Sequence, residues 1–163
     1  MSTDQNLATA FAGESQANRK YLAFAKQAEA DGYPQVARLF RATAEAETIH
    51  AHAHLRAMGG IKSTADNLKA AISGETYEYS EMYPPFISEA DAEKNPAAAR
   101  SFKMANEAEK VHAQLYQKAL DNLAKKEVTD LYLCAVCGHI AEGQLPDTCP
   151  ICGAKAAAYK KID

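Results

Sequence analysis

The stretch EAETIHA at residues 45–51 recurs as EAEKVHA at residues 107–113, 62 positions further along the chain. Each copy contains a Glu-x-x-His motif, formed by Glu47 with His50 and by Glu109 with His112. Residues three apart lie on one face of a helix, so each motif can direct a carboxylate and an imidazole at one centre. The repeat predicts two similar helical segments, each with half of a metal site.

A second repeated element lies upstream of each motif, where GES at residues 13–15 matches GET at residues 74–76. Residues from about 4 to 125 are rich in Ala, Glu, Lys and Leu, which favours helices over strands. Gly and Pro signals then divide this region into four helices, with breaks at Asp31-Gly32 before Pro34, at Gly59-Gly60 and at Asn95-Pro96. Pro84-Pro85 is expected to interrupt the third helix. We predict two similar helical hairpins.

Each predicted hairpin supplies one Glu from its first helix and a Glu-x-x-His from its second. Two such sets, directed inward from four helices, form the ligand set of ferritin-like di-iron and di-manganese carboxylate proteins. Burying the carboxylates alone would cost on the order of several kcal/mol per charge, and two divalent metals offset this cost. Carboxylate and imidazole ligands suit iron or manganese. The predicted ligands are Glu14, Glu47, His50, Glu75, Glu109 and His112.

The two halves differ at Glu78, which lies three residues after Glu75 and aligns with Ala17. This additional carboxylate makes the predicted site asymmetric, with seven candidate ligands. We hypothesise that Glu78 binds in one oxidation state and withdraws in the other, with the exchange at the iron nearest His50.

Two tyrosines lie near the predicted ligands in the sequence. Tyr21 is two helical turns beyond Glu14, and Tyr83 is five residues beyond Glu78. A hydrogen bond to a ligand carboxylate explains both tyrosines, and packing in the helical core explains them equally well.

All four cysteines lie in two Cys-x-x-Cys-Gly knuckles, which contain Cys134 with Cys137 and Cys149 with Cys152. Two such knuckles, separated by 11 residues, predict a tetrahedral four-cysteine metal site. The cysteines alone leave iron and zinc equally open. Because a di-iron site needs a one-electron donor, which zinc cannot be, we predict iron.

The composition changes after Lys125, where Gly and Pro residues indicate tight turns. We therefore predict a four-helix domain at residues 1–127 and a small loop-and-strand domain at residues 128–163, which needs its metal for stability. The net charge is −3, from 18 basic and 21 acidic residues, which disfavours nucleic acid and anionic membranes as partners. The absence of a signal-like start and of a long apolar stretch, together with cysteines spaced as metal ligands, predicts a cytoplasmic protein.

These motifs together resemble the rubrerythrin family, in which a ferritin-like di-iron domain precedes a rubredoxin-like domain. The resemblance spans nearly the whole chain and includes FAGESQA at residues 11–17, GETYEY at residues 74–79 and both cysteine knuckles. It implies that the seven Glu and His candidates bind two irons, that Tyr21 and Tyr83 hydrogen-bond to the ligands, and that the cysteines bind a rubredoxin-type iron. It also implies reduction of hydrogen peroxide with electrons that pass from NAD(P)H through a separate reductase or rubredoxin.

Two other functions are compatible with parts of the sequence. A ferroxidase or iron-handling protein would use the same di-iron site, although iron storage needs no electron-transfer module. A zinc-stabilised interaction module joined to a helical scaffold would explain the cysteines without any redox chemistry.

The connection between the second and third helices is short for a ferritin-like crossover, which must run back along the bundle. His50 and Glu75 are separated axially by about 27 Å of helix, at 1.5 Å per residue. A linker of about seven residues, near residues 59–64, reaches at most about 25 Å. We therefore predict a homodimer that swaps helix pairs, in which the first hairpin of one chain pairs with the second hairpin of another.

Overall fold

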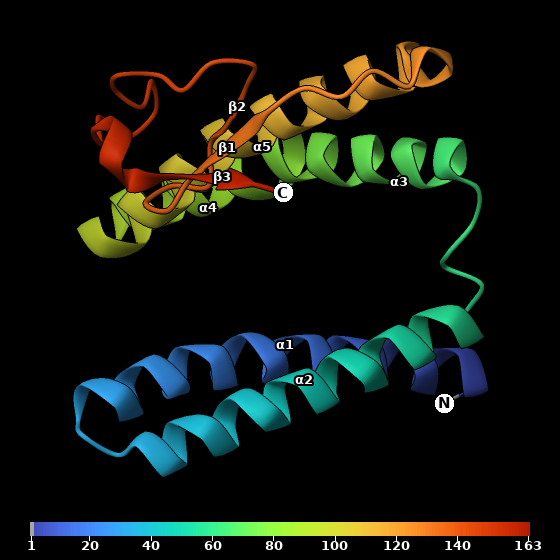
Figure 1. The fold of residues 1–163 in the computed structure, drawn as a ribbon, viewed down its shortest axis with the longest axis vertical. Helices are drawn as coiled ribbons and strands as arrows, with labels where there is room; N and C mark the ends of the chain where they lie inside the picture. The colour runs from blue at the N-terminus through green and yellow to red at the C-terminus, as the bar shows by residue number, and fades with distance from the viewer. Residues whose placement is uncertain (1) are drawn as a thin grey trace. The chain divides into compact units, whose positions relative to one another are not determined.

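The computed structural model describes residues 2–163, which form two compact units that divide between Lys62 and Ser63. The first unit is a hairpin of two long helices, α1 (Thr3–Ala30) and α2 (Pro34–Ala57), which lie side by side (Figure 1). Ser2 and Gln5 form a capping box at the start of α1. Gly32 adopts a φ of 82° in the turn before Pro34, so the predicted break is confirmed.

The second unit begins with a helical hairpin and ends with a small sheet. Its first arm consists of α3 (Thr64–Tyr77), the π-helix η1 (Glu78–Met82) and α4 (Tyr83–Ala92), and all three pack against α5 (Pro96–Asp121). A 3₁₀ turn, η2 (Leu123–Lys125), leads to the C-terminal module. None of the helices in the described part of the chain combines the length and the apolar character that a membrane span requires.

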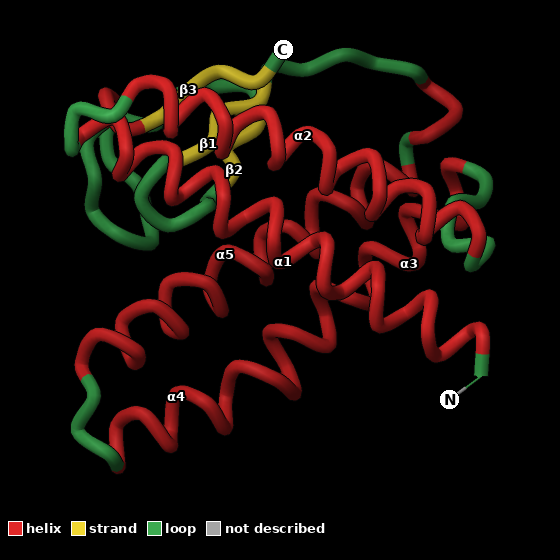
Figure 2. The backbone as a smooth tube through the Cα atoms, turned by 90° about the horizontal axis from the view of Figure 1, so that it is seen from below, coloured by secondary structure: helices red, strands yellow, loops and turns green. Residues whose placement is uncertain are grey.

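The C-terminal module is a three-stranded antiparallel sheet with strand order β2-β1-β3, drawn in yellow in Figure 2. Its strands are β1 (Leu131–Cys134), β2 (Ile140–Glu142) and β3 (Tyr159–Ile162), and the 3₁₀ turn η3 (Ala156–Ala158) precedes β3. The chain is therefore mainly helical, with a small strand module at its C-terminus, as predicted.

The predicted interruption of the third helix is confirmed, but it begins at Glu78, upstream of the two prolines. Both prolines instead lie in the first turn of α4, where a missing N–H costs little. The repeat explains the position of the break, because Glu14 and Tyr21 are seven residues apart whereas Glu75 and Tyr83 are eight apart. A π-helix accommodates one additional residue within a helix, so η1 is where the second hairpin departs from the first.

Each hairpin contains a trio of aromatic rings. Tyr21, Phe24 and Phe40 pack with ring centroids 5.6–6.3 Å apart. The residues 62 positions later form the same cluster with centroids 5.7–6.4 Å apart, and they are Tyr83, Phe86 and Phe102. The structural repeat therefore extends beyond the predicted ligands to the packing that positions the two helices.

The most buried apolar side chains of both hairpins are alanines, which allow the helices to approach closely. Ala37 on α2 is fully buried, whereas Ala42 on the same helix is exposed. Substitution of Ala37 by Leu should therefore lower the free energy of unfolding by about 1–3 kcal/mol through overpacking. The matched substitution of Ala42 by Leu should change it by less than about 0.5 kcal/mol. Urea unfolding of both metal-free variants measures the difference, and equal losses would contradict a close packing at Ala37.

Candidate metal centres

The first hairpin brings together Glu14 from α1 and Glu47 and His50 from α2. His50 Nδ1 lies 2.9 Å from Glu47 Oε2 and 3.9 Å from Glu14 Oε1. One potential ligand atom from each residue lies within 4.8 Å of the others, which is close enough to hold one ion. The sequence-predicted trio of this hairpin is thus assembled within one unit.

The second hairpin repeats this arrangement with Glu75 from α3 and Glu109 and His112 from α5. His112 Nδ1 lies 2.6 Å from Glu109 Oε2 and 3.7 Å from Glu75 Oε2, and the three potential ligand atoms again lie within 4.8 Å of one another. The two half-sites differ in exposure, because the His50 side chain is 55% exposed and that of His112 only 17%. The second half-site is therefore the more enclosed of the two.

His112 is held from its other side by the C-terminal module. Its Nε2 lies 2.9 Å from the carbonyl oxygen of Gly138, which directly follows Cys137. A carbonyl oxygen only accepts hydrogen bonds, so Nε2 carries the proton and the lone pair of Nδ1 is left for a metal. This arrangement, in which the outer nitrogen of a ligand imidazole donates to a carbonyl, is typical of metal-binding histidines.

Glu78 lies on η1, outside the two three-residue clusters, but close to the second of them. Burial and the negative charge of Glu75 raise the pKa of Glu78. Burial also raises the pKa of Glu75, together with its hydrogen bond to the Glu109 carboxyl group and the charge of that group. The carboxylates of this hairpin therefore gather at a cost in free energy that bound cations would remove.

The two tyrosines lie in different surroundings. Burial raises the pKa of Tyr83, and the charges of Glu109, Glu78 and Glu75 raise it further, so this ring lies beside the carboxylates. Tyr21 packs with the aromatic rings of its own hairpin. Both tyrosines therefore take part in core packing, and Tyr83 is also adjacent to the predicted ligands.

The four cysteines are free and converge between the two knuckles. The Sγ atoms of Cys134 and Cys152 lie 3.7 Å apart, and those of Cys137 and Cys149 lie 3.5 Å apart. A tetrahedral site with metal–sulfur bonds of about 2.3 Å requires sulfurs about 3.8 Å apart. The thiols are thus arranged for one tetrahedral ion.

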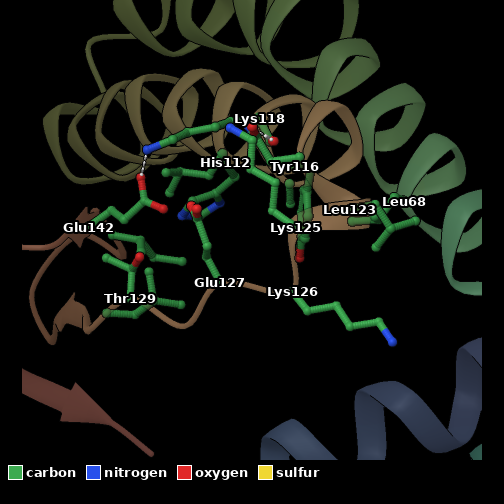
Figure 3. A pocket seen from close by; sticks show the side chains of 15 residues that line it. Leu68, His112, Tyr116, Lys118, Leu123, Lys125, Lys126, Glu127, Thr129 and Glu142 are labelled. Atoms are coloured by element: carbon green, nitrogen blue, oxygen red, sulfur yellow. Dashed lines mark hydrogen bonds and ion pairs between the residues drawn. The ribbon is translucent and has the colours of Figure 1, made fainter.

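A cavity of about 600 Å³ lies within the second unit, between α5 and strands β1 and β2 (Figure 3). His112 lines this cavity, and Lys118 on its rim forms an ion pair with Glu142 of β2. The pair is largely exposed on its lysine side, so it contributes little to stability. The ion pair nevertheless joins α5 to β2, and the hydrogen bond between His112 and Gly138 likewise joins α5 to the C-terminal module.

Some polar residues near the metal centres were not found from the sequence. Gly138 was interpreted only as a turn residue, whereas its carbonyl oxygen binds His112. His139 and Tyr159, which form a hydrogen bond near the cysteines, were not singled out at all. The position of His139, two residues after Cys137, was the one available signal.

The fold and the two ligand sets define a ferritin-like di-iron protein with a C-terminal rubredoxin-like iron module. Comparison with protein families agrees, because the rubrerythrin model matches residues 5–120 and the model of the rubrerythrin rubredoxin-like domain matches residues 132–160. The chain belongs to the rubrerythrin family. The predicted boundary between residues 127 and 128 falls between the two matches and stays a prediction.

Curated relatives support this assignment over nearly the full chain. Nigerythrin of Nitratidesulfovibrio vulgaris is 42% identical across 93% of this chain and 82% of its own length. Rubrerythrin-2 of Clostridium acetobutylicum is 37% identical across 94% of this chain and 93% of its own length. Among solved structures, nigerythrin in a partially reduced state aligns with a TM-score of 0.61 and 38% identity, covering 99% of this chain and 87% of that one.

The raised pKa values predict how the metal-free protein responds to pH. A carboxyl group whose pKa is higher in the folded state stabilises the fold fully below its ordinary value of 4.5. This contribution is lost as the pH rises through the raised pKa. Above that pKa the group's contribution to the free energy of unfolding no longer changes with pH. Metal-free protein should therefore become less stable from pH 4.5 upward, and the substitution Glu78→Gln should make this fall smaller. Urea unfolding across the pH range measures it.

The matched control is Glu81→Gln, which changes an exposed carboxylate on the same π-helix. This variant should keep the wild-type dependence on pH. Equal pH dependence in the wild type and in Glu78→Gln would contradict the placement of Glu78 in a partly buried, negatively charged environment.

Proposed function

We propose that the chain is a non-haem di-iron peroxidase that reduces hydrogen peroxide to water in the cytoplasm, with electrons relayed from an NAD(P)H-dependent reductase or rubredoxin. The observation that carries this proposal is the hydrogen bond between His112 and Gly138, which joins the two ligand sets. We assign the di-iron site to Glu14, Glu47, His50, Glu75, Glu78, Glu109 and His112, and the mononuclear iron site to Cys134, Cys137, Cys149 and Cys152.

When bound, two ferrous ions would supply the two electrons that, with two protons from solvent, reduce hydrogen peroxide to two waters, and a four-cysteine iron would return electrons singly. The chain's own residues connect the second ligand trio to the cysteine site. His112 offers Nδ1 to the di-iron site while its Nε2–H donates to the carbonyl oxygen one residue after Cys137. Beyond this hydrogen bond, seven covalent bonds lead from the carbonyl oxygen of Gly138 to Cys137 Sγ, so the relay needs no further protein group.

The two histidines have different surroundings, which supports different roles. His112 is anchored by the C-terminal module, whereas the His50 side chain is 55% exposed. The hypothesis that Glu78 exchanges with His50 when the oxidation state changes thus assigns the exchange to the histidine that the C-terminal module does not hold. Crystals of oxidised and reduced protein with identical coordination at both irons would contradict the exchange.

Stopped-flow mixing of the reduced protein tests the choice of oxidant. We expect hydrogen peroxide to oxidise the di-iron site at least about tenfold faster than dioxygen does. The substitution Glu78→Gln should slow the peroxide reaction by about 10–100-fold, which is the usual effect of changing a group at a metal site. The control Glu81→Gln should react like the wild type, because its side chain is exposed.

Faster oxidation by dioxygen, with accumulation of ferric iron, would instead support the ferroxidase function. A colourless purified protein that contains zinc at the cysteines would support the interaction module. Metal analysis with a visible absorption spectrum should find about three irons per chain and the red colour of a ferric four-cysteine site.

We further propose that the active protein is a homodimer that swaps its hairpins. The linker after α2 can span a shorter distance than its number of residues suggests. Gly60 N–H donates to the carbonyl oxygen of Leu55, which holds residues 58–60 in a helix cap. The segment from Gly60 to Thr64 spans at most about 14 Å when extended. The distance required to align His50 with Glu75 in a ferritin-like bundle is about 27 Å.

A complementation experiment tests the swap. One variant carries Glu47→Ala and His50→Ala, and the other carries Glu109→Ala and His112→Ala, so neither has a complete site alone. In a swapped heterodimer one of the two di-iron sites combines only intact hairpins, and co-expression should restore about half of the di-iron content per dimer. Isolation through two different tags, followed by iron analysis, measures this recovery.

The circular dichroism of each variant alone checks that its helices form. If both variants are helical and dimeric but their heterodimer contains no di-iron site, each chain completes its own site and the swap is wrong.

A further inference from the structure

Asn18 is a buried polar residue that joins the two helices of the first hairpin. It lies on α1, four residues after Glu14, and is only 7% exposed. Its Nδ2 lies 2.7 Å from the carbonyl oxygen of Ala44 and 2.8 Å from Oγ1 of Thr48, both on α2. Because Thr48 directly follows Glu47, the amide connects the part of α1 that carries one predicted ligand to the part of α2 that carries another.

The orientation of this amide follows from its partners. A carbonyl oxygen only accepts hydrogen bonds, so the nitrogen of Asn18, and not its oxygen, must face Ala44. The Thr48 hydroxyl accepts the second N–H of the amide and donates its own proton to the same carbonyl oxygen, 3.1 Å away. A shift of α1 along α2 would break both bonds of the amide, so this network fixes the register of the two helices.

The asparagine carries a cost in stability. Its Oδ1 is buried and has no hydrogen-bond donor within the part of the chain that the structure describes. A buried acceptor without a partner lowers the stability of a fold, and leucine, which has a similar branched shape, would leave no such atom. An asparagine buried between helices can specify their register at a cost in stability. The register that Asn18 imposes, and not the stability that it contributes, therefore explains this residue.

The second hairpin does not repeat this connection. At the positions 62 residues later, the residues that replace Asn18, Ala44 and Thr48 are Ser80, Asn106 and Lys110. The hydroxyl of Ser80 donates to the carbonyl oxygen four residues earlier, and Lys110 pairs with Glu107 on its own helix. The histidine of this hairpin is held instead by the carbonyl oxygen of Gly138. The two ligand trios therefore have different anchors.

Within the first ligand trio, only one of the two short distances depends on how the helices are placed. Glu47 and His50 are on one helix, so the turn of α2 sets the 2.9 Å between them. Glu14 is on the other helix, and the 3.9 Å from its Oε1 to His50 Nδ1 depends on the register of α1 against α2. This is the register that the Asn18 amide fixes.

We propose that Asn18 is a positioning residue, which holds Glu14 at the correct height for Glu47 and His50 and thereby raises the affinity of the di-iron site for iron. Residues that orient metal ligands from outside the ligand set typically contribute about 10–100-fold in affinity. The inference rests on the proposed assignment of this trio to the di-iron site, but it does not depend on peroxide as the oxidant.

Anaerobic titration of the full-length protein with ferrous iron, with zinc at the cysteines and a competing chelator, measures the affinity of the helical site alone. Asn18→Leu keeps the branched shape and removes the amide, so the affinity should fall about tenfold. Urea unfolding of the metal-free protein should find equal or higher stability, because the substitution leaves no buried polar group without a partner. Lower affinity without lower stability distinguishes a positioning role from a purely structural one.

Two substitutions of Thr48 test the same network from α2. Thr48→Ser keeps the hydroxyl and should bind iron like the wild type, whereas Thr48→Val removes it and should lower the affinity. The matched control is Thr43→Val. The Thr43 hydroxyl makes the same bond to the carbonyl oxygen four residues earlier, that of Leu39, and among the described residues it makes no bond to α1. This control should keep the wild-type affinity.

Equal iron affinity in the wild type and in Asn18→Leu would overturn the proposal. A fall in affinity that is accompanied by a fall in the stability of the metal-free protein would also overturn it, as would equal losses of affinity in Thr48→Ser and Thr48→Val. A wild-type protein that binds no iron at the helical site would overturn the ligand assignment itself, and with it this role of Asn18.

Discussion

Carboxylates gathered on the facing surfaces of helices repel one another, and this repulsion constrains the whole protein. In the second hairpin, burial and neighbouring negative charge raise the pKa values of Glu75 and Glu78. The sequence nevertheless keeps the acids at these positions, although apolar residues would pack at less cost. Bound cations turn this penalty into a binding energy, so folding and metal loading are coupled in the helical part. The cysteine knuckles follow the same rule, because a small module gains its stability from the ion that it encloses.

The internal repeat shows where the two similar helical hairpins differ. The aromatic trios agree at a constant spacing of 62 residues, and so do the Glu-x-x-His motifs. The first-helix acids, Glu14 and Glu75, are 61 residues apart, and the change in spacing occurs across η1. The second half therefore differs from the first in spacing by one additional residue. The π-helix that absorbs it carries Glu78, the one predicted ligand that the first hairpin lacks.

Sequence patterns predicted the features that depend on local spacing. Glu47 with His50 and the cysteine pairs were recognisable because helical periodicity and knuckle geometry bring nearby residues together. The start of the π-helix at Glu78 was missed, because the two prolines marked the place where a helix cannot continue and not the place where the extra residue is absorbed. The contact between His112 and Gly138 was also missed, since it joins a helix to a module 26 residues away. Such contacts follow from packing, which no short pattern encodes.

The repeat also explains why the two histidines are not equivalent despite their matching motifs. The C-terminal module follows α5 directly along the chain, so it can reach the imidazole of the second hairpin and hold its outer nitrogen. His50, in the first hairpin, has no module attached to its helix and is largely exposed. The two ligand trios therefore differ in their surroundings, because the C-terminal module holds the histidine of the second hairpin. Attaching a single module to one of two similar hairpins is thus sufficient to make two matching ligand trios unequal.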